Sequence, residues 1–90
     1  MWSIYILQCV DCSYYVGISE DLFKRVEEHN RGKGAEYTKL KRPLRLIYYE
    51  AVQEKVSAEK REVEIKKLSK RNKERLIKCG KGVRVSLGHD

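Results

Sequence analysis

The sequence predicts one α+β domain, in which a small sheet packs with helices in the order β-β-α-β-α-α. The chain has 90 residues, a length that suits a single hydrophobic core. Apolar residues make up 41% of it and charged residues 37%, which is too polar for a membrane protein and, with six tyrosines, too apolar for a disordered segment. Two strand-like segments come first, and helix-like segments then flank a third strand.

The first two predicted strands form a hairpin. Residues 2–8 are rich in β-branched and aromatic side chains, and residues 14–18 form a second such run. Between them, residues 10–13 read as a turn, because Asp11 and Ser13 offer local hydrogen bonds to the backbone.

A first helix and a long loop follow the hairpin. Ser19 is the predicted N-cap, and the spacing of Leu22 and Val26 predicts a helix over about residues 20–30. Residues 31–43 hold two glycines, the only proline and five basic side chains. We therefore expect a long loop there that can hold a phosphate backbone.

The second half predicts one strand and two helices. Residues 44–52 are typical of a third strand, and Ser57 is the predicted cap of a long helix over 58–70. Asn72 interrupts the helical pattern, so a shorter helix is expected over 73–79. No element is assigned after it.

Basic side chains are concentrated in the last third of the chain. Residues 1–54 hold eight basic and eight acidic side chains, whereas residues 55–84 hold twelve basic and four acidic ones. A one-sided basic surface attracts nucleic acids or acidic membranes, although a solvated lysine-rich helix has the same composition. Seven basic residues of the loop and the C-terminal third are the predicted nucleic-acid contacts: Lys33, Lys39, Lys41, Arg42, Lys66, Lys67 and Lys70.

The three cysteines predict free thiols in a reducing compartment. The chain begins without a basic leader, and no apolar run is long enough to span a bilayer, so we expect a cytoplasmic protein. Cys9 and Cys12 have the spacing of two zinc ligands, but only Cys79 and His89 could complete a tetrahedral site. We favour a simple turn, with a small zinc-binding protein as the third alternative.

One carboxylate interrupts an apolar helix face. The stripe of the long predicted helix runs through Ala58, Ile65 and Leu68. Glu62 falls on this stripe, where an ionised carboxylate needs a compensating cation such as a divalent metal ion. The alternative, which the spacing alone favours, is that Glu62 reaches water or pairs with Lys66.

Four further side chains could complete a site for phosphate chemistry. Arg25 and His29 share one side of the first helix, where Arg can hold a phosphate oxygen and His can move a proton. Tyr5 and Tyr15 stand in the hairpin strands, where neighbours such as Gly17 beside Tyr15 leave room for a ligand. Each feature alone is also typical of an ordinary core or surface. Their convergence with the interrupting carboxylate favours a catalytic site.

The ordered set of motifs resembles the GIY-YIG nuclease superfamily over roughly residues 2–77. Ser3-Ile4-Tyr5, followed by Tyr15-Val16-Gly17, is similar to the paired signature, with Ser3 for the first glycine and Val16 for the second isoleucine. Three further segments resemble the arginine helix, the loop and third strand, and the glutamate helix of the small stand-alone bacterial members: Leu22 to Asn30; Tyr37-Thr38 with Arg42-Pro43-Leu44 and Tyr48-Tyr49-Glu50; and Ala58 to Leu68.

The resemblance implies a small three-stranded antiparallel sheet flanked by about three helices, and metal-dependent phosphodiester cleavage. Tyr5 would be the general base or orient water, and Tyr15 would lie beside the attacking oxygen. Arg25 would stabilise charge on the phosphoryl oxygens, His29 would assist nearby, and Glu62 would bind one divalent ion, Mg²⁺ or Mn²⁺. A tyrosine has a pKa of about 10, so Tyr5 would need a cation nearby to lower it.

The resemblance also implies one catalytic domain over residues 1–80, with 81–90 as a short C-terminal tail. Members with defined targets carry extra DNA-binding domains, so this chain is expected to bind substrate weakly unless a partner protein supplies specificity. The expected function is a strand- or structure-directed DNA endonuclease. RNA has the same phosphodiester linkage and is the open alternative as a substrate. The alternative is a nucleic-acid-binding module with the nuclease fold and little or no turnover. Asn72 is the nearest candidate for the late asparagine of the family.

Overall fold

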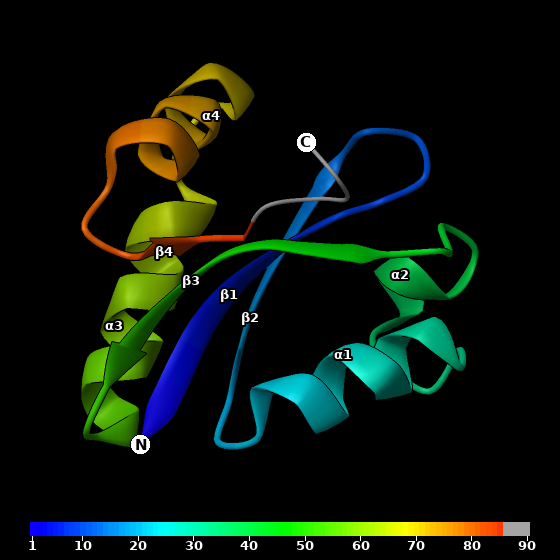
Figure 1. Ribbon diagram of the computed structural model, residues 1–90, viewed down its shortest axis with the longest axis horizontal. Helices are drawn as coiled ribbons and strands as arrows, with labels where there is room; N and C mark the ends of the chain where they lie inside the picture. Colours follow the sequence, from blue (N-terminus) through cyan, green and yellow to red (C-terminus); the bar gives the residue numbers. More distant parts are fainter. Residues whose placement is uncertain (86–90) are drawn as a thin grey trace.

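The computed structural model describes residues 1–85 and has the element order β-β-α-α-β-α-α-β (Figure 1). Four strands are present: Trp2–Gln8 (β1), Tyr14–Ser19 (β2), Arg45–Val52 (β3) and Val83–Arg84 (β4). Four helices accompany them: Leu22–Asn30 (α1), Glu36–Lys39 (α2), Lys55–Lys66 (α3) and Lys70–Cys79 (α4). The α+β class is confirmed, but the described residues hold one strand and one helix more than predicted.

The strands form one antiparallel sheet in the order β2-β1-β3-β4. The central strand β1 is buried on both faces, because successive side chains point to opposite sides of a strand. Ile4 and Ile6 belong to one buried cluster, whereas Tyr5 and Leu7 belong to a second. This two-sided burial explains why β1 reads as a continuous apolar run.

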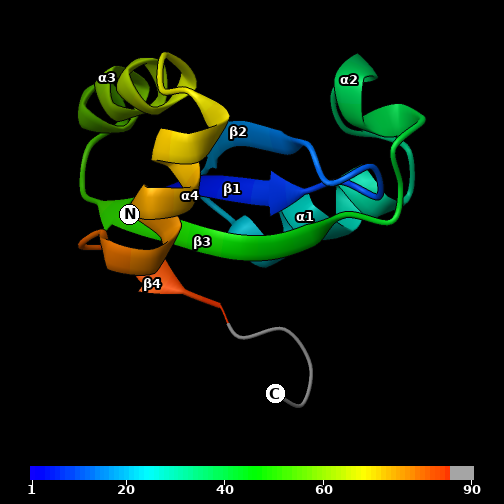
Figure 2. The same cartoon turned by 90° about the horizontal axis from the view of Figure 1, so that it is seen from above.

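Helices cover both faces of the sheet (Figures 1 and 2). The face with α3 and α4 holds the cluster that contains Ile4 and Ile6, to which α3 contributes Ala58 and Ile65, both completely buried. On the opposite face, α1 contributes Leu22 to the cluster around Tyr5 and Leu7. None of the helices in the described part of the chain could cross a membrane.

The fourth strand lies where no element was expected. It pairs with Tyr48 and Tyr49 at the free edge of β3. The backbone N–H of Gly82 donates to the hydroxyl of Tyr48 at 3.0 Å and fixes the chain just before β4. A two-residue strand has no periodicity of its own, so only this long-range pairing reveals it.

A half-buried ion pair ties α3 to β3. The guanidinium of Arg61 donates from Nε and Nη2 to the two carboxylate oxygens of Glu50, at 2.8 and 3.0 Å. The hydroxyl of Tyr48 donates to the same carboxylate at 2.6 Å. These hydrogen bonds hold the pKa of Glu50 below its usual value, against the opposing effect of burial.

The helical turn α2 corrects the prediction of a continuous loop over 31–43. Ala35 is extended at its N-cap, and the hydroxyl of Thr38 donates to the carbonyl of Ala35 at 2.9 Å. Such side-chain bonds to a nearby backbone group stabilise a single turn. Four residues are too few to produce a helical pattern among the glycines and lysines of this segment.

The first helix begins two residues later than predicted. Asp21, not Ser19, is the N-cap, and its carboxylate accepts from the backbone N–H of Lys24 at 3.2 Å. The hydroxyl of Ser19 instead accepts from the N–H of Asp21 at 3.0 Å. Both residue types suit an N-cap, so the sequence alone did not distinguish them.

The last two helices meet at a different residue from the one predicted. The N-cap of α3 is Glu54, so the predicted cap at Ser57 is wrong and this serine lies within the helix. Ser69 caps α4, and its hydroxyl accepts from the backbone N–H of Asn72 at 3.1 Å. Asn72 therefore lies inside α4, and the break falls at residues 67–69.

Candidate functional site

Tyr5 is positioned by the glycine opposite it. Tyr5 and Gly17 are direct partners in the β1–β2 pair, and a Cβ added to Gly17 would lie 2.5 Å from the Tyr5 hydroxyl oxygen. The phenol therefore lies across the backbone of β2, where only glycine leaves enough space. The room that was expected to admit a ligand beside Gly17 is filled by Tyr5 itself.

A buried chain of hydrogen bonds leads away from this phenol. The hydroxyl of Tyr5 and Nε2 of His29 are 3.0 Å apart, and Nδ1 of His29 is 2.8 Å from the hydroxyl oxygen of Thr38. All three side chains are buried, His29 and Thr38 completely. A Cβ at Gly34 would overlap the imidazole, so this glycine lets the loop backbone pack against the ring.

Two charged side chains from different helices act on the pKa of Tyr5. Arg25 comes from α1 and Glu62 from α3, and 34% and 21% of their side chains are exposed. Burial raises the pKa of Tyr5 to about 12; Arg25 acts to lower it, and Tyr15 and Glu62 raise it further. The expected cation is therefore present, but it does not outweigh burial, and Tyr5 is a neutral phenol at pH 7.

Both charged groups already have partners on their own helices. Arg25 donates to Glu28 at 3.1 Å, and Glu62 pairs with Lys66 at 3.1 Å. The pairing of Glu62 with Lys66 was the alternative favoured by spacing, and the structure shows this ion pair. These pairs are partly exposed, so an incoming phosphate or cation can compete for either partner.

Tyr15 connects the buried chain to the basic loop. Its ring centroid lies 5.2 Å from that of His29, and the ring also stacks with Tyr37 at a centroid distance of 6.1 Å. The ammonium of Lys41 lies 4.1 Å from the centre of the Tyr37 ring and pairs with Asp11 at 2.9 Å. The loop is thus anchored to the β1–β2 turn, and Lys41 is engaged in that anchor.

The seven predicted nucleic-acid contacts lie in two separate groups. Lys33, Lys39, Lys41 and Arg42 come from the segment around α2, whereas Lys66, Lys67 and Lys70 lie at the junction of α3 and α4. Several are partly neutralised or held: Lys39 lies 3.5 Å from Glu36, and Arg42 donates to the carbonyl of Lys39 at 2.9 Å. Lys70 lies over the ring of Tyr14 at 5.7 Å.

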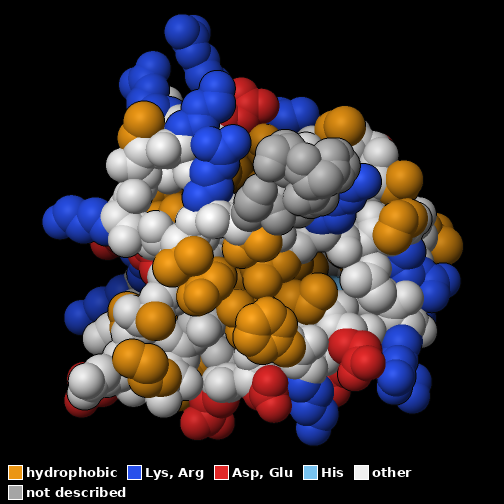
Figure 3. Space-filling model, viewed as in Figure 1, with side chains coloured by type: hydrophobic (Ala, Val, Ile, Leu, Met, Phe, Trp, Pro, Cys, Tyr) orange, Lys and Arg blue, Asp and Glu red, His pale blue; other side chains and the backbone are white. Residues whose placement is uncertain are grey.

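A basic face on α4 was missed in the sequence. Arg71, Arg75 and Lys78 are exposed and fall on one side of the helix, because they are four and then three residues apart. None of them forms an ion pair with an acidic residue of the described chain. Figure 3 shows basic side chains gathered over α4. The helical spacing of the basic residues in 70–79 could have revealed this face from the sequence.

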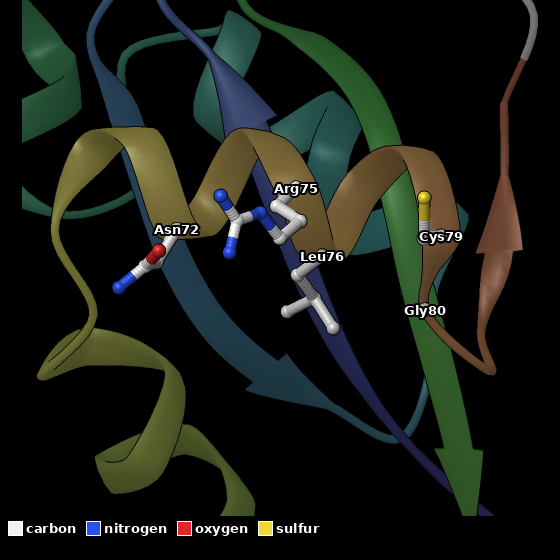
Figure 4. Close-up of a pocket in the computed structure, with 5 residues that line it drawn as sticks. All are labelled: Asn72, Arg75, Leu76, Cys79 and Gly80. Carbon is white, nitrogen blue, oxygen red and sulfur yellow. The ribbon is translucent and has the colours of Figure 1, made fainter.

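Asn72 and Arg75 lie beside a shallow hollow on α4, together with Leu76, Cys79 and Gly80 (Figure 4). Asn72 is exposed and comes from α4, whereas the elements that position Tyr5 and its neighbours are β1, β2, α1 and α3. The structure therefore adds no contact between Asn72 and the buried hydrogen-bond chain.

The cysteine pair forms the predicted turn. The N–H of Cys12 donates to the carbonyl of Cys9 at 2.9 Å, and Asp11 accepts from the N–H and hydroxyl of Ser13 at 3.0 and 2.6 Å. Cys9 is buried and Cys12 exposed. No three His, Cys, Asp or Glu side chains within residues 1–85 gather into a metal site, and His89 lies outside the described residues.

Comparison with known proteins covers the segment that builds this site. The model of the GIY-YIG catalytic domain matches residues 1–75. UPF0213 proteins of Staphylococcus aureus strains Mu3 and Mu50 are 51% identical over 75 residues, which span 83% of this chain and 92% of each relative. The solution NMR structure of the UPF0213 protein BH0048 from Bacillus halodurans is similar with a TM-score of 0.57 and 42% identity, covering 87% of this chain and 84% of that one.

Proposed function

The chain belongs to the GIY-YIG catalytic domain family, and on that premise we propose that it is a divalent-metal-dependent endonuclease acting on DNA. The observation that carries the proposal is the Tyr5–His29 hydrogen bond, and the charges of Arg25 and Glu62 both act on the pKa of the same phenol. This arrangement combines a proton path, a phosphate-binding cation and a carboxylate for a metal ion. We expect the enzyme to select a strand or a structure and to work in the cytoplasm, where free thiols stay reduced.

Glu62 is the residue that would hold the metal ion. Since the described residues contain no three-ligand cluster, this half-buried carboxylate would act together with phosphate oxygens and water. Mg²⁺ is commonly held by one or two carboxylates plus substrate phosphates, so the donor set fits. When bound, Mg²⁺ or Mn²⁺ would supply positive charge to the phosphate and the leaving oxygen.

Arg25 would bind the scissile phosphate. Its guanidinium is partly exposed, and the same group acts on the pKa of Tyr5, so a phosphate held there would lie next to the phenol. A guanidinium can make two charge-assisted hydrogen bonds to phosphate oxygens. Fixed positive charge at this point stabilises the negative charge that develops as water attacks. The bond to Glu28 would be exchanged for the bond to phosphate.

Tyr5 and His29 form the path by which a proton leaves the attacking water. As the water oxygen bonds to phosphorus, its proton passes to the Tyr5 oxygen while the Tyr5 proton passes to Nε2 of His29. The bond from phosphorus to the leaving oxygen breaks, and that oxygen keeps the electron pair. Tyr5 is thus a neutral phenol before and after the step, in keeping with its pKa of about 12. Burial lowers the pKa of His29, so His29 begins as a neutral base.

The experiment is cleavage of branched, flapped and single-stranded DNA by the purified protein with Mg²⁺ or Mn²⁺. We expect Glu62→Gln and Arg25→Gln each to reduce the rate by about 100-fold or more. Glu59→Gln and Lys24→Gln are matched controls, because each removes one charge of the same sign at an exposed position of the same helix. Cleavage that persists unchanged in the two site variants would identify a contaminating nuclease and refute the proposal.

A nucleic-acid-binding module without turnover is the second candidate, and the exposed face of Arg71, Arg75 and Lys78 favours it. Binding through phosphates weakens steeply with salt, and each lost contact to duplex DNA lowers the slope of log K against log salt by about 0.9. Replacing all three residues by Gln should lower that slope. Salt-sensitive binding without metal-dependent cleavage would favour the module, and a partner protein would then supply the chemistry or the target.

A further inference from the structure

We propose that Thr38 is a positioning residue that holds His29 in the tautomer protonated at Nδ1, so that the lone pair of Nε2 faces the hydroxyl of Tyr5. The inference rests on the proposed function for its catalytic consequence. Its structural part is the position of one proton on the imidazole ring of His29. Thr38 does not contact the reacting atoms and acts only through His29.

The hydroxyl of Thr38 has one proton, and that proton is already used. It is donated to the carbonyl of Ala35, at an oxygen-to-oxygen distance of 2.9 Å. The same hydroxyl oxygen lies 2.8 Å from Nδ1 of His29. With its proton on the Ala35 carbonyl, which can only accept, the oxygen serves His29 as an acceptor, and Nδ1 is then the donor.

A neutral imidazole carries a proton on one ring nitrogen only. Burial and the nearby charge of Arg25 lower the pKa of His29, against a smaller effect of Glu28, so the ring is neutral at pH 7. With the proton on Nδ1, Nε2 is an acceptor, and the hydroxyl of Tyr5 donates to it at 3.0 Å. The opposite tautomer would require the Thr38 hydroxyl to give up its bond to the Ala35 carbonyl and to donate to Nδ1 instead.

The helical turn α2 provides the framework for this contact. Ala35 is the N-cap of α2, and Thr38 follows three residues later, where its hydroxyl reaches back to the Ala35 carbonyl. Gly34 allows the preceding backbone to pack against the imidazole. The titratable and charged groups around His29 are Tyr5 from β1, Tyr15 from β2, and Arg25 and Glu28 from α1.

The bond from Nδ1 to Thr38 also suits the protonated ring. When Nε2 accepts the proton of Tyr5, both ring nitrogens become donors, and the Thr38 oxygen continues to accept from Nδ1. No hydrogen bond behind the ring has to reverse during the step. A partner already oriented for the charged state lowers the cost of forming that state.

The test is the tautomer of His29, measured by ¹⁵N NMR of histidine-labelled protein. The variant His89→Gln leaves His29 as the only histidine and serves as the background. We expect a protonated Nδ1 in this background and with Thr38→Ser, which retains the hydroxyl. With Thr38→Val, which has a similar shape without a hydroxyl, we expect a mixture of tautomers or protonation at Nε2. In cleavage assays Thr38→Val should lower kcat by about 10- to 100-fold with little change in KM, and Thr38→Ser should restore most of it.

A proton on Nε2 in the unsubstituted Thr38 protein would overturn the inference, whatever the activity. A Thr38→Val protein with unchanged tautomer and unchanged kcat would also overturn it. If Thr38→Val does not fold, the background protein and Thr38→Ser still decide the tautomer. A protein with Nδ1 protonated but no nuclease activity would refute the proposed function while supporting the role of Thr38 in holding the ring.

Discussion

The phenol of Tyr5 lies across the backbone of Gly17, its partner on the neighbouring strand. Adjacent strands are only about 4.8 Å apart, so an aromatic ring can reach over the next strand if nothing projects from it. His29 contacts the hydroxyl at the end of the same ring. The position of the phenol therefore depends on two features: the glycine beneath the ring leaves space for it, and the imidazole forms a hydrogen bond with its hydroxyl.

We expect Gly17→Ala to destabilise the protein by about 1–3 kcal/mol, because the added methyl group has no space beneath the phenol. Displacing the phenol should also weaken its hydrogen bond to His29 and lower any nuclease activity. The free energy of unfolding in urea measures the first effect. In a Tyr5→Leu background the same glycine substitution should cost much less, and equal costs in the two backgrounds would contradict the predicted contact.

The stability of the fold should decrease as the pH falls below about 6.5, the value at which His titrates in an unfolded chain. The pKa of His29 is lowered in the folded state, chiefly by burial. Below pH 6.5 the unfolded chain therefore binds a proton at this histidine more readily than the folded chain does. The free energy of unfolding then falls by at most about 1.4 kcal/mol per pH unit.

Urea unfolding between pH 5.5 and 7 measures this slope, at values above the range in which most carboxylates titrate. His29→Gln should remove the slope, whereas His89→Gln, which removes the other histidine, should leave it. An undiminished slope in His29→Gln would show that another group is responsible.

Glu28→Gln should increase the affinity for single-stranded DNA. Glu28 pairs with Arg25 at 3.1 Å, and its removal frees the guanidinium for phosphate. Both side chains are about one-third exposed, so solvent screens the pair and the gain should be only about twofold beyond the general effect of charge. Glu27→Gln is the matched control, since Glu27 pairs with Arg31 on the exposed surface at 3.3 Å. Equal gains in the two variants would argue against competition at Arg25.

Arg61→Met should destabilise the fold by about 1–3 kcal/mol, because it leaves the carboxylate of Glu50 with Tyr48 as its remaining side-chain partner. Only 14% of the Glu50 side chain is exposed, whereas 35% of the Arg61 side chain is exposed, so screening favours the lower end of this range. Glu64→Gln, which breaks only the exposed end of the network, should change stability by less than about 0.5 kcal/mol. Thermal unfolding compares the two, and equal effects would contradict a special role for the Glu50 pair.

Local sequence patterns predicted those strands and helices that depend mainly on residues within their own segment. The run at Trp2–Gln8 is apolar on both faces, and the turn before Tyr14 contains residues that bond their own backbone, so the hairpin was visible in the sequence. The helix containing Arg25 and His29 was visible for the same reason. The motifs also indicated the family, because their order along the chain can be read without knowing how far apart they lie in the folded protein.

Residue patterns were enough to predict the α+β class, the hairpin and the helices that carry Arg25 and Glu62, and to propose the candidate site residues. Folding had to be seen before it was clear that Gly17 accommodates Tyr5 rather than a ligand, that α2 brings Thr38 behind His29, and that β4 joins the sheet at Tyr48. These two groups of features differ in the range of the interactions that produce them. Periodicity and capping act within a few residues, whereas a close backbone approach, a buried hydrogen bond and a two-residue edge strand exist only between segments that folding brings together.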